Sequence, residues 1–240
     1  MRRVFLIAAI LLSAAAPSLA QEQLKVGNTY SGSIKLSSSN GGIYLPLLEG
    51  TWVLTSLEKL GSKLNEAGSV PMLGGSLVAT DDQKRVTGIM VFYSGNDSAG
   101  GWQPQPLCYR KDLFFVHTEV QRRGNRETRC WAVSAASMAA PTATAPNSIR
   151  DYYQYVHKNG FKLPQTTINV TIIRSSSAKF LQATYYRNPE LDGFPRAATT
   201  VWQKDVVVGD AKRLKYLEDV KAWGEQWQPT FDAAFAGRPK

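Results

Sequence analysis

The sequence has few of the side chains that bind metals or carry out covalent catalysis. It contains two cysteines and two histidines in 240 residues, and neither an HExxH nor a CxxC motif occurs. The nucleophile motif G-x-S-x-G and the glycine-rich phosphate-binding motifs are absent as well. The sequence therefore predicts no metal site and no cofactor. It favours a protein with a binding or structural role over an enzyme.

Long apolar runs are also scarce, and the clearest one lies at the N-terminus. Arg2 and Arg3 precede an apolar stretch at 4–16, and small residues follow it up to Ala20. The stretch is too short to cross a bilayer comfortably, and the pattern is that of a secretory signal peptide. We therefore expect residues 1–20 to be removed and the mature chain to be exported, to the periplasm or the exterior, without an integral membrane segment.

Acidic residues are fewer than basic ones. The 19 aspartates and glutamates oppose 28 lysines and arginines, which gives a formal net charge of +9. Removal of Arg2 and Arg3 with the signal peptide leaves +7 on the mature chain. A basic protein is able to contact anionic lipids, acidic glycans or nucleic acid. We do not expect nucleic acid as a partner, because the protein is expected to be exported. The alternative is that the charge serves solubility alone.

The composition is that of a folded protein. Hydrophobic residues make up 43% of the chain and charged residues 20%, which are ordinary values for globular domains. Residues 21–240 are enough to form one sizeable core, so we expect a single domain. The segment 141–146, P-T-A-T-A-P, resembles a linker in composition, and an internal division there is the alternative.

Alternating and β-branched runs predict an antiparallel sheet. Runs at 76–80 and 85–93 flank a polar turn, which predicts a hairpin whose second strand is central because both of its faces are apolar. Apolar residues alternate with threonine and asparagine in 167–173, which predicts a half-exposed strand. Residues 59–74 are polar and irregular and are expected to form a loop. Further strands are predicted around 30–36 and at 43–45, 51–55, 113–120, 127–134 and 180–187.

Two helices complete the expected fold. Ser148 is a candidate N-cap for a helix at 149–158, where apolar residues repeat at helical spacing. Asp210 is a candidate N-cap for a second helix that runs to about residue 228, where Pro229 is expected to break or kink it before a short last helix. The order of elements predicts an α+β fold, an antiparallel sheet of meander and hairpins packed against a mid-chain helix and C-terminal helices.

Cys108 and Cys130 are expected to form a disulfide, because cysteines in exported proteins usually pair. The stretch between them also holds a turn signal at Gly124-Asn125. A tight hairpin there would place Glu119 opposite Cys130, and a straight strand would then carry Cys108 about 36 Å away. Because a disulfide needs Cα atoms within about 7 Å, we expect the disulfide and, in place of the hairpin, a return loop.

His117 is the candidate for a catalytic residue. It lies in the run F-F-V-H-T-E-V. A small hydrolase with a dispersed site would use His117 as a general base beside a serine or a carboxylate. A histidine in a strand is more often a hydrogen-bonded structural residue, however. For His157, in the last turn of its predicted helix, a structural or solvated role is the default.

Arginines gather in the stretch before the second cysteine. Arg122, Arg123, Arg126 and Arg129 lie within eight residues of one another. Guanidinium groups suit phosphate and carboxylate, so this segment is a candidate site for an anionic component of the cell envelope, and a merely solvated loop is the alternative. Trp102, in a loop rich in glycine and proline, is a candidate ligand contact or a lid folded onto the core.

The predicted C-terminal helix carries an aromatic stripe. Tyr216, Val220, Trp223 and Trp227 fall on one helical face. Such a face is able to lie on a membrane, which makes peripheral membrane association another functional alternative. The other interpretation is that the stripe packs on the core, because a helix of a globular protein needs an apolar face.

Overall fold

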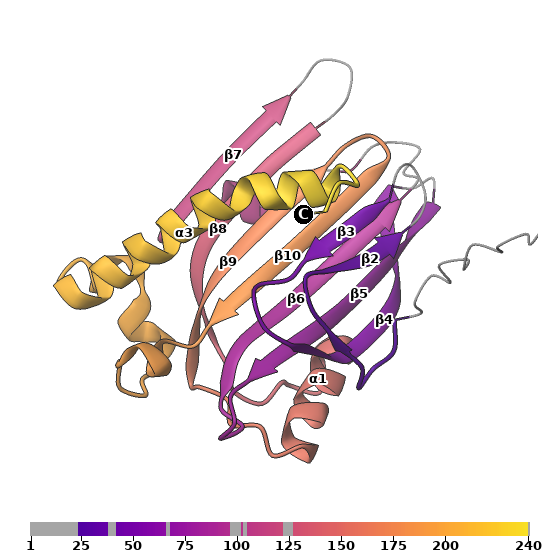
Figure 1. Cartoon of the computed structure of the whole chain (residues 1–240). Coiled ribbons are helices and arrows are strands. Elements are labelled where there is room, and N and C mark those ends of the chain that lie inside the picture. Colours follow the sequence, from indigo (N-terminus) through magenta and orange to yellow (C-terminus); the bar gives the residue numbers. More distant parts are fainter. Residues whose placement is uncertain are drawn as a thin grey trace, which may run out of the picture.

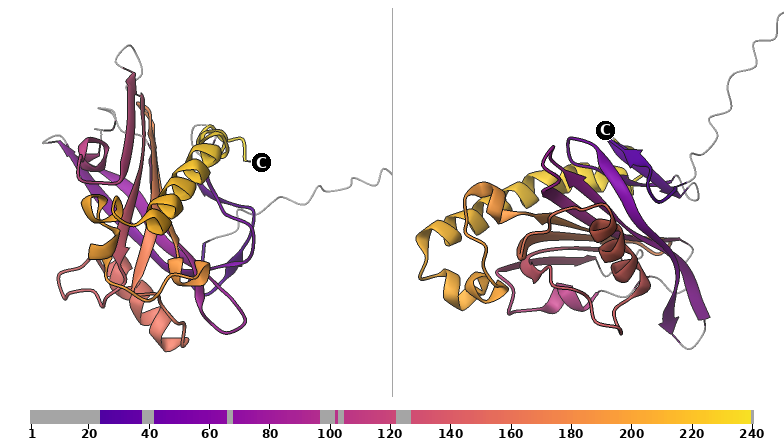
Figure 2. Two further views of the ribbon diagram at one scale, coloured as in Figure 1. Left: turned by 90° about the vertical axis from the view of Figure 1, so that its left-hand side faces the viewer. Right: turned by 90° about the horizontal axis from the view of Figure 1, so that it is seen from below.

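The structure is a computed structural model that describes residues 24–37, 42–65, 68–96, 102, 105–121 and 127–239. The predicted signal peptide lies outside the described residues, as do Arg122, Arg123 and Arg126. Most of the described chain forms one antiparallel sheet of eight strands, with helices packed against it (Figures 1 and 2). This arrangement confirms the expected α+β fold.

The strands of the large sheet follow the order β1-β4-β5-β6-β10-β9-β8-β7. They are β1 (Thr29–Tyr30), β4 (Trp52–Asn65), β5 (Gly68–Thr80), β6 (Val86–Asn96), β7 (Phe115–Gln121), β8 (Glu127–Ser137), β9 (Thr166–Ser175) and β10 (Lys179–Arg187). The order arises from two meanders, β4-β5-β6 and β7-β8-β9-β10, which join where β6 pairs with β10. Strands from both sides of the segment 141–146 therefore belong to one sheet.

The remaining elements cover the sheet or connect its strands. They are the two-stranded sheet of β2 (Ser33–Ser37) and β3 (Ile43–Pro46), the 3₁₀ turns η2 (Pro106–Tyr109), η3 (Pro189–Asp192) and η4 (Thr199–Trp202), and the helices α1 (Asn147–Lys158), α2 (Lys204–Val207) and α3 (Ala211–Phe235). Asp210 caps α3 as predicted, because its carboxylate accepts a hydrogen bond of 3.0 Å from the Arg213 N–H. Over the part of the chain that the structure describes, no helix is long and apolar enough to cross a membrane.

One face of the sheet is covered by α3 and by the β2-β3 sheet (Figure 1). Val220 and Phe231 of α3 are buried in the main core together with Leu45 of β3. Gly224 allows the helix to lie close to the sheet, since a Cβ at this position would lie 2.7 Å from the Trp131 ring. The aromatic stripe of α3 thus faces the core.

The opposite face is covered in part by α1, which packs over β4 and β5. Tyr152 and Val156 of α1 form a second core cluster with Val78 and Ile89. The neighbour of Ile89 in β6, Met90, belongs to the core under α3, because successive side chains of a strand point to opposite faces. The expectation that β6 is a central strand is confirmed.

Residues 59–74 are expected to form a loop, but the described residues of this range, 59–65 and 68–74, form much of the β4-β5 hairpin. Glu58 pairs with Gly74, and the ladder continues to the pair of Asn65 and Gly68. Backbone hydrogen bonds hold such a ladder together, so it does not require the apolar alternation that marks a half-buried strand. The expectation was wrong because it relied on side-chain pattern alone.

Strand β9 is buried along its whole length, whereas the alternation at 167–173 predicts a half-exposed strand. It lies between β8 and β10. The Thr171 hydroxyl is hydrogen-bonded to the Thr184 hydroxyl on β10 at 3.0 Å, and the Thr167 hydroxyl donates to the Ala136 carbonyl. The threonine face is therefore a buried face whose hydroxyls find partners within the sheet.

Helix α3 continues through Pro229, where a break or kink and a new helix were expected. Arg174 on β9 is hydrogen-bonded to Gln228 and to Asp232, which lie on either side of the proline. The Gln228 amide also donates to the Gly224 carbonyl at 3.1 Å. These contacts hold both turns of the helix against the sheet and outweigh the loss of one backbone hydrogen bond at the proline.

Helix α1 begins at Asn147, and Ser148 does not cap it. Pro146 occupies the N-cap position without a side-chain hydrogen bond. The carboxylate of Glu58 on β4 instead accepts a hydrogen bond of 3.2 Å from the Ser148 N–H. A carboxylate at this end also suits the helix dipole. A residue distant in sequence therefore supplies the cap that Ser148 was predicted to supply.

Candidate functional site

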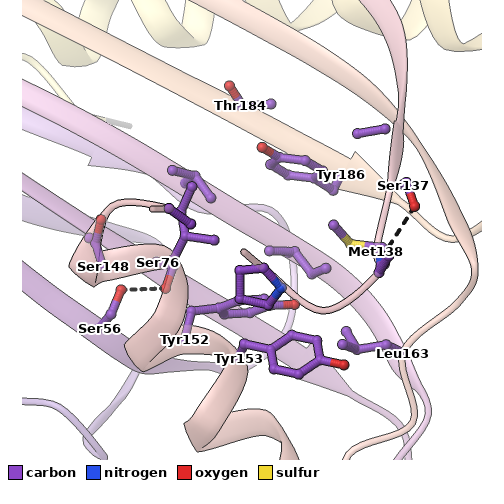
Figure 3. A pocket seen from close by; sticks show the side chains of 18 of the residues that line it. Ser56, Ser76, Ser137, Met138, Ser148, Tyr152, Tyr153, Leu163, Thr184 and Tyr186 are labelled. Atoms are coloured by element: carbon purple, nitrogen blue, oxygen red, sulfur yellow. Dashed lines mark hydrogen bonds between the residues drawn. The ribbon is translucent and has the colours of Figure 1, made fainter. Parts of the chain in front are cut away.

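A pocket of about 390 Å³ lies between the sheet and the chain that covers its α1 side (Figure 3). Its volume is typical of small-molecule sites. Ser76, Val91 and Thr184 form a row across its floor, because Ser76 pairs with Val91 and Val91 pairs with Thr184. The two neighbouring rows of the ladder complete the floor with Ile89, Tyr93, Gln182 and Tyr186.

The walls of the pocket come from α1 and from the segments before and after it. Their lining residues are Met138, Ala139, Pro141, Ala145, Ser148, Ile149, Tyr152, Tyr153 and Leu163. Among the described residues that line the pocket, none carries a charge. Apolar and aromatic groups with a few hydroxyls are the usual lining of a site for a small organic molecule.

Hydroxyl groups gather at one end of the pocket. The Ser76 hydroxyl is hydrogen-bonded to the Ser56 hydroxyl at 2.6 Å and to the Thr55 hydroxyl at 2.8 Å. Figure 3 shows Ser56, Ser76 and Ser148 together at this end, whereas Met138 and Leu163 lie at the other. The serine cluster therefore lies at one end of the pocket, whereas the other end combines the apolar Met138 and Leu163 with the hydroxyls of Ser137 and Tyr153.

Tyr152 brings a buried polar atom without a partner to this pocket. Its side chain is 7% exposed, and its Oη has no hydrogen-bond partner among the described residues. A buried hydroxyl that lacks a partner costs about 1–3 kcal/mol. Unsatisfied groups of this kind in folded proteins call for a physical explanation, and a molecule bound in the pocket would provide one.

Three tyrosines of the pocket, Tyr93, Tyr152 and Tyr186, have a raised pKa and remain protonated near neutral pH. Burial raises the pKa of Tyr186 to about 12 and also raises the pKa of Tyr152. The pKa of Tyr93 is raised by burial and, further, by the nearby Glu58 carboxylate. A protonated phenol exchanges hydrogen bonds with a ligand but does not act as a general base.

The serines of the pocket have no base beside them among the described lining residues. Neither a histidine nor a carboxylate is part of that lining. A serine hydroxyl is a weak nucleophile until an adjacent base activates it. The described lining offers hydroxyl groups and apolar surface to a molecule, and a carboxylate outside this lining, that of Glu58, accepts a hydrogen bond from the Ser148 N–H.

Trp102 lies in a smaller pocket of about 240 Å³ that adjoins the first. The two pockets share Tyr93 and Gln182. The Trp102 side chain is 3% exposed and packs on Phe180 with ring centroids 4.9 Å apart. Trp102 is therefore folded onto the sheet beside the larger pocket, and its role as a ligand contact stays a prediction.

His117 lies away from these pockets, on the edge strand β7. It is about half exposed and is hydrogen-bonded to Glu119 at 3.0 Å, and this contact holds the pKa of the Glu119 carboxyl below its usual range. Its cross-strand partner Trp131 packs in the core under α3. His117 and Trp102 thus occupy two unrelated places, and catalysis by His117 stays a prediction without a supporting contact.

Of the four arginines proposed for anion binding, Arg129 is described. It is exposed on β8, between Glu119 on β7 and Arg174 on β9. It also lines a cleft of about 620 Å³ together with Lys179 and Arg238 at the C-terminal end of α3. Arg122, Arg123 and Arg126 fall outside the described residues.

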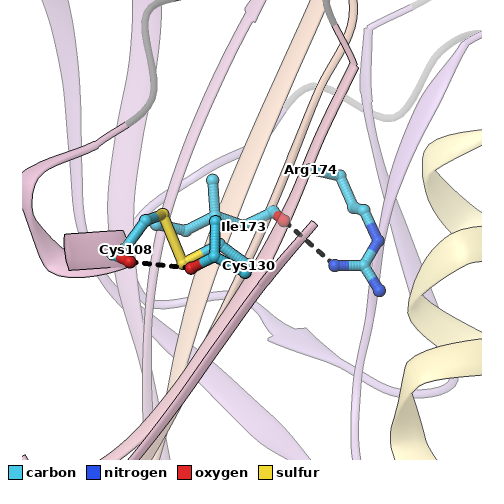
Figure 4. The surroundings of a disulfide bond; sticks show 5 residues. Cys108, Cys130, Ile173 and Arg174 are labelled. Atoms are coloured by element: carbon cyan, nitrogen blue, oxygen red, sulfur yellow. Dashed lines mark hydrogen bonds between the residues drawn. A yellow bond between two sulfur atoms is a disulfide. The ribbon is translucent and has the colours of Figure 1, made fainter. Parts of the chain in front are cut away.

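Cys108 and Cys130 form the expected disulfide, with Cα atoms 5.7 Å apart (Figure 4). A β7-β8 hairpin is present as well, in a register that places Thr118 opposite Cys130 where Glu119 was expected. The turn predicted at Gly124-Asn125 lies outside the described residues. The two features coexist because the chain before β7 is not straight. The turn η2 and the bend at 111–114 fold Cys108 back over β7. The expectation of a return loop in place of the hairpin was wrong in its premise of a straight strand.

The residues of the main pocket do not appear among the candidates from the sequence. They come from β4, β5, β6, β8, β10 and α1 and from the connections beside α1, so no local motif unites them. A weak signal exists in the polar residues that alternate with apolar ones, such as Thr184 and Gln182 in β10. Such alternation is normally a sign of a solvent-facing strand, which is why it did not indicate a site.

Within the described parts of the chain, no group of three or more histidine, cysteine, aspartate or glutamate side chains is placed to hold a metal ion. No model of a known protein family matches the sequence, and neither a characterised protein nor a solved structure is significantly similar to it. Function must therefore be inferred from the pocket itself.

Proposed function

We propose that the protein is an exported, non-enzymatic binding protein that takes up a small molecule with a largely apolar body in the pocket between the sheet and α1. The observation that carries this proposal is the buried Tyr152 hydroxyl, which finds no hydrogen-bond partner among the described residues, beside a pocket whose described lining is uncharged. A bound molecule would accept or donate the missing hydrogen bond. The aromatic rings beside it would contribute apolar contact area.

Export is supported by two independent features. The N-terminal sequence has the three parts of a signal peptide. The Cys108–Cys130 disulfide is of a kind that persists in oxidising compartments such as the periplasm or the exterior. A protein in such a compartment meets small molecules from the surroundings before they reach the cytoplasm.

Fluorescence titration with N-phenyl-1-naphthylamine tests the proposal. This uncharged aromatic amine emits strongly in apolar surroundings, so we expect a saturable increase with a single class of site. Val91→Trp and Ala145→Trp would fill the pocket from the sheet and from the covering segment respectively, and both should abolish the saturable signal. Val208→Trp, at a residue that is 67% exposed, adds the same side chain at the surface and should bind as wild type does.

The titration has a result that overturns the proposal. If the probe binds equally well to both pocket-filling variants while their near-ultraviolet circular dichroism remains native, the pocket is not the site. Two variants are used because Val91 lies in a central strand, where a larger side chain is able to disturb packing. Ala145 is half-buried in the covering segment, where the same change is better tolerated.

A second candidate function is contact with an anionic component of the envelope through the cleft at the end of α3. Arg129, Lys179 and Arg238 line this cleft, and Glu127 and Asp232 offset part of their charge. Cosedimentation with phosphatidylglycerol vesicles at low salt tests it. The double variant Arg129→Gln/Arg238→Gln should lose retention, whereas Lys111→Gln/Lys215→Gln, with the same change in net charge elsewhere, should keep it. Equal retention of both variants would argue against this function.

A further inference from the structure

A basic pocket adjoins the end of the main pocket that holds Met138 and Leu163. Its volume is about 380 Å³. The two pockets share five lining residues, Ser137, Met138, Ala139, Tyr153 and Leu163. In Figure 3 the four of these that are labelled, Ser137, Met138, Tyr153 and Leu163, lie together at the end away from Ser56 and Ser148.

The two pockets differ in charge. The second is lined by Lys162, Arg196 and His157, and none of its described lining residues is acidic. Among the described residues Lys162 has no ion-pair partner. Arg196 lies 3.5 Å from Glu190, whose carboxylate also accepts a hydrogen bond of 2.8 Å from the N–H of the lining residue Gln165 and so offsets part of the Arg196 charge. With this carboxylate counted, Lys162 still leaves a net positive charge beside the uncharged pocket.

The backbone holds these basic residues in place. The Lys162 N–H donates to the Lys84 carbonyl at 2.8 Å, and the Lys162 carbonyl accepts from the Val86 N–H at 3.1 Å. The Arg196 guanidinium donates to the Leu163 carbonyl at 3.1 Å. The His157 ring packs against Tyr153 with centroids 4.3 Å apart. Lys162 is therefore held by the sheet, Arg196 by Leu163, which lines both pockets, and His157 by its neighbour Tyr153 on α1.

The C-terminal end of α1 also lies here and would by itself disfavour an anion. Its last carbonyl groups are occupied, however. The Tyr155 carbonyl accepts from Asn159, the Val156 carbonyl accepts from Phe161, and the His157 carbonyl accepts from Gly160. Hydrogen bonds to these carbonyls reduce the negative potential at the helix end, so the side-chain cations dominate.

We propose that the ligand of the main pocket is an amphiphile with one anionic group, whose apolar body lies between the sheet and α1 and whose anion lies beside Lys162 and Arg196. This inference rests on the proposed function, because it assigns the charge of the molecule that the main pocket would bind. Carboxylate and phosphate share the chemistry that a lysine and an arginine recognise. His157 adds a further donor beside the same anion.

A matched pair of probes tests the inference separately from the proposed function. The dye 8-anilinonaphthalene-1-sulfonate has the ring system of N-phenyl-1-naphthylamine with a sulfonate added. We expect the sulfonate to bind about threefold to tenfold more tightly than the neutral amine, the gain expected from two partly exposed charge contacts. High salt should reduce this difference, because salt screens exposed charges.

The double variant Lys162→Gln/Arg196→Gln should abolish the preference for the sulfonate and leave the neutral amine bound as before. Lys111→Gln/Lys215→Gln has the same change in net charge and should keep the preference. Competition with decanoate and decyl phosphate then identifies the anion, since stronger displacement by one of them assigns its acid group, and decan-1-ol should displace less than either.

Two results overturn the inference while the proposed function stands. One is equal affinity of wild type for the sulfonate and the neutral amine. The other is a preference for the sulfonate that survives in Lys162→Gln/Arg196→Gln. If Val91→Trp and Ala145→Trp leave the affinity for both probes unchanged while the protein remains folded, both the proposed function and the inference fail. Native near-ultraviolet circular dichroism of each variant ensures that sulfonate fluorescence does not report partly unfolded protein.

Discussion

The Thr118 hydroxyl on β7 donates a hydrogen bond of 2.7 Å to the carbonyl oxygen of Cys108, whose disulfide partner Cys130 lies directly opposite Thr118 in the β7-β8 ladder. The folded-back η2 segment is thus tied to both strands of one hairpin at the same level. The disulfide is buried with Trp102, Ile173 and Phe180 on the face that also carries the main pocket. It closes one end of that face.

The disulfide should contribute substantially to stability. The two cysteines are separated by 22 residues, for which the chain-entropy relation gives about 3 kcal/mol. We expect Cys108→Ala/Cys130→Ala to lower the free energy of unfolding by about this amount, measured by urea denaturation, and reduction of wild type to add two hydrogens by mass spectrometry. Thr118→Val, which keeps the disulfide and removes the hydroxyl, should cost about 1 kcal/mol. Wild-type stability in the double alanine variant would show that the disulfide is not a constraint.

The ion pair between Arg174 and Asp232 should hold α3 on the sheet. Arg174 is 5% exposed, and burial lowers the pKa of its guanidinium although Asp232 opposes the shift. Loss of a partner from a buried pair costs about 3–5 kcal/mol, and we expect about 2–3 kcal/mol for Asp232→Ala because its carboxylate is partly exposed and Gln228 remains. Asp219→Ala removes the partner of exposed Lys215 on the same helix and should change stability by less than about 0.5 kcal/mol. Similar losses in the two variants would contradict a role of Arg174 in docking the helix.

Tyr152 and Tyr185 should respond with opposite sign to removal of the hydroxyl. The Tyr185 hydroxyl donates a buried hydrogen bond of 2.9 Å to the Pro46 carbonyl, so Tyr185→Phe should destabilise the protein by about 1–2 kcal/mol. The Tyr152 hydroxyl has no hydrogen-bond partner in the described part of the chain, so Tyr152→Phe should leave stability unchanged or raise it by up to about 1 kcal/mol. Thermal unfolding without ligand measures both. A loss in Tyr152→Phe as large as that in Tyr185→Phe would mean that the Tyr152 hydroxyl is already satisfied.

The N-cap of α3 should make stability depend on acid pH. The hydrogen bond from the Arg213 N–H and the neighbouring Arg213 charge hold the pKa of the Asp210 carboxyl below its ordinary value of 3.8. A lowered folded-state pKa means that the contribution is present above the unfolded value and is lost as pH falls through the folded value. Wild type should therefore unfold at a higher temperature than Asp210→Asn near pH 7, and the difference should shrink near pH 3.

Asp210→Ala provides the control for this acid dependence. Asparagine keeps an oxygen that accepts the Arg213 N–H, whereas alanine removes the cap at every pH. We expect Asp210→Ala to unfold at a lower temperature than Asp210→Asn at both pH values, as followed by far-ultraviolet circular dichroism. A difference between wild type and Asp210→Asn that stays constant with pH would show that the carboxylate charge is not involved.

The sequence predicted correctly those elements that depend on interactions between residues close together in the chain. The β5-β6 hairpin has a polar turn between two β-branched runs, the strand at 85–93 is apolar on both faces, and Asp210 precedes the apolar periodicity of α3. Each of these features is confirmed, because turn geometry and capping depend on residues a few positions apart. The candidate site is different. Its floor, its walls and its basic neighbour come from strands and connections that are distant in sequence.

The sequence by itself determined the fold class, the pairing of the two cysteines and the scarcity of catalytic motifs, since these follow from periodicity, composition and the number of partners available. Tertiary structure alone decided the features that differ from what the neighbouring residues in the sequence predict. Arg174 contacts α3 on both sides of Pro229, where the helix is continuous, and the folded η2 segment lets the disulfide and the hairpin coexist. Burial of the threonine face of β9 and the unpaired hydroxyl of Tyr152 depend on what covers the sheet. The physical reason is that hydrogen-bond satisfaction and desolvation are set by neighbours in space, which a linear pattern does not specify.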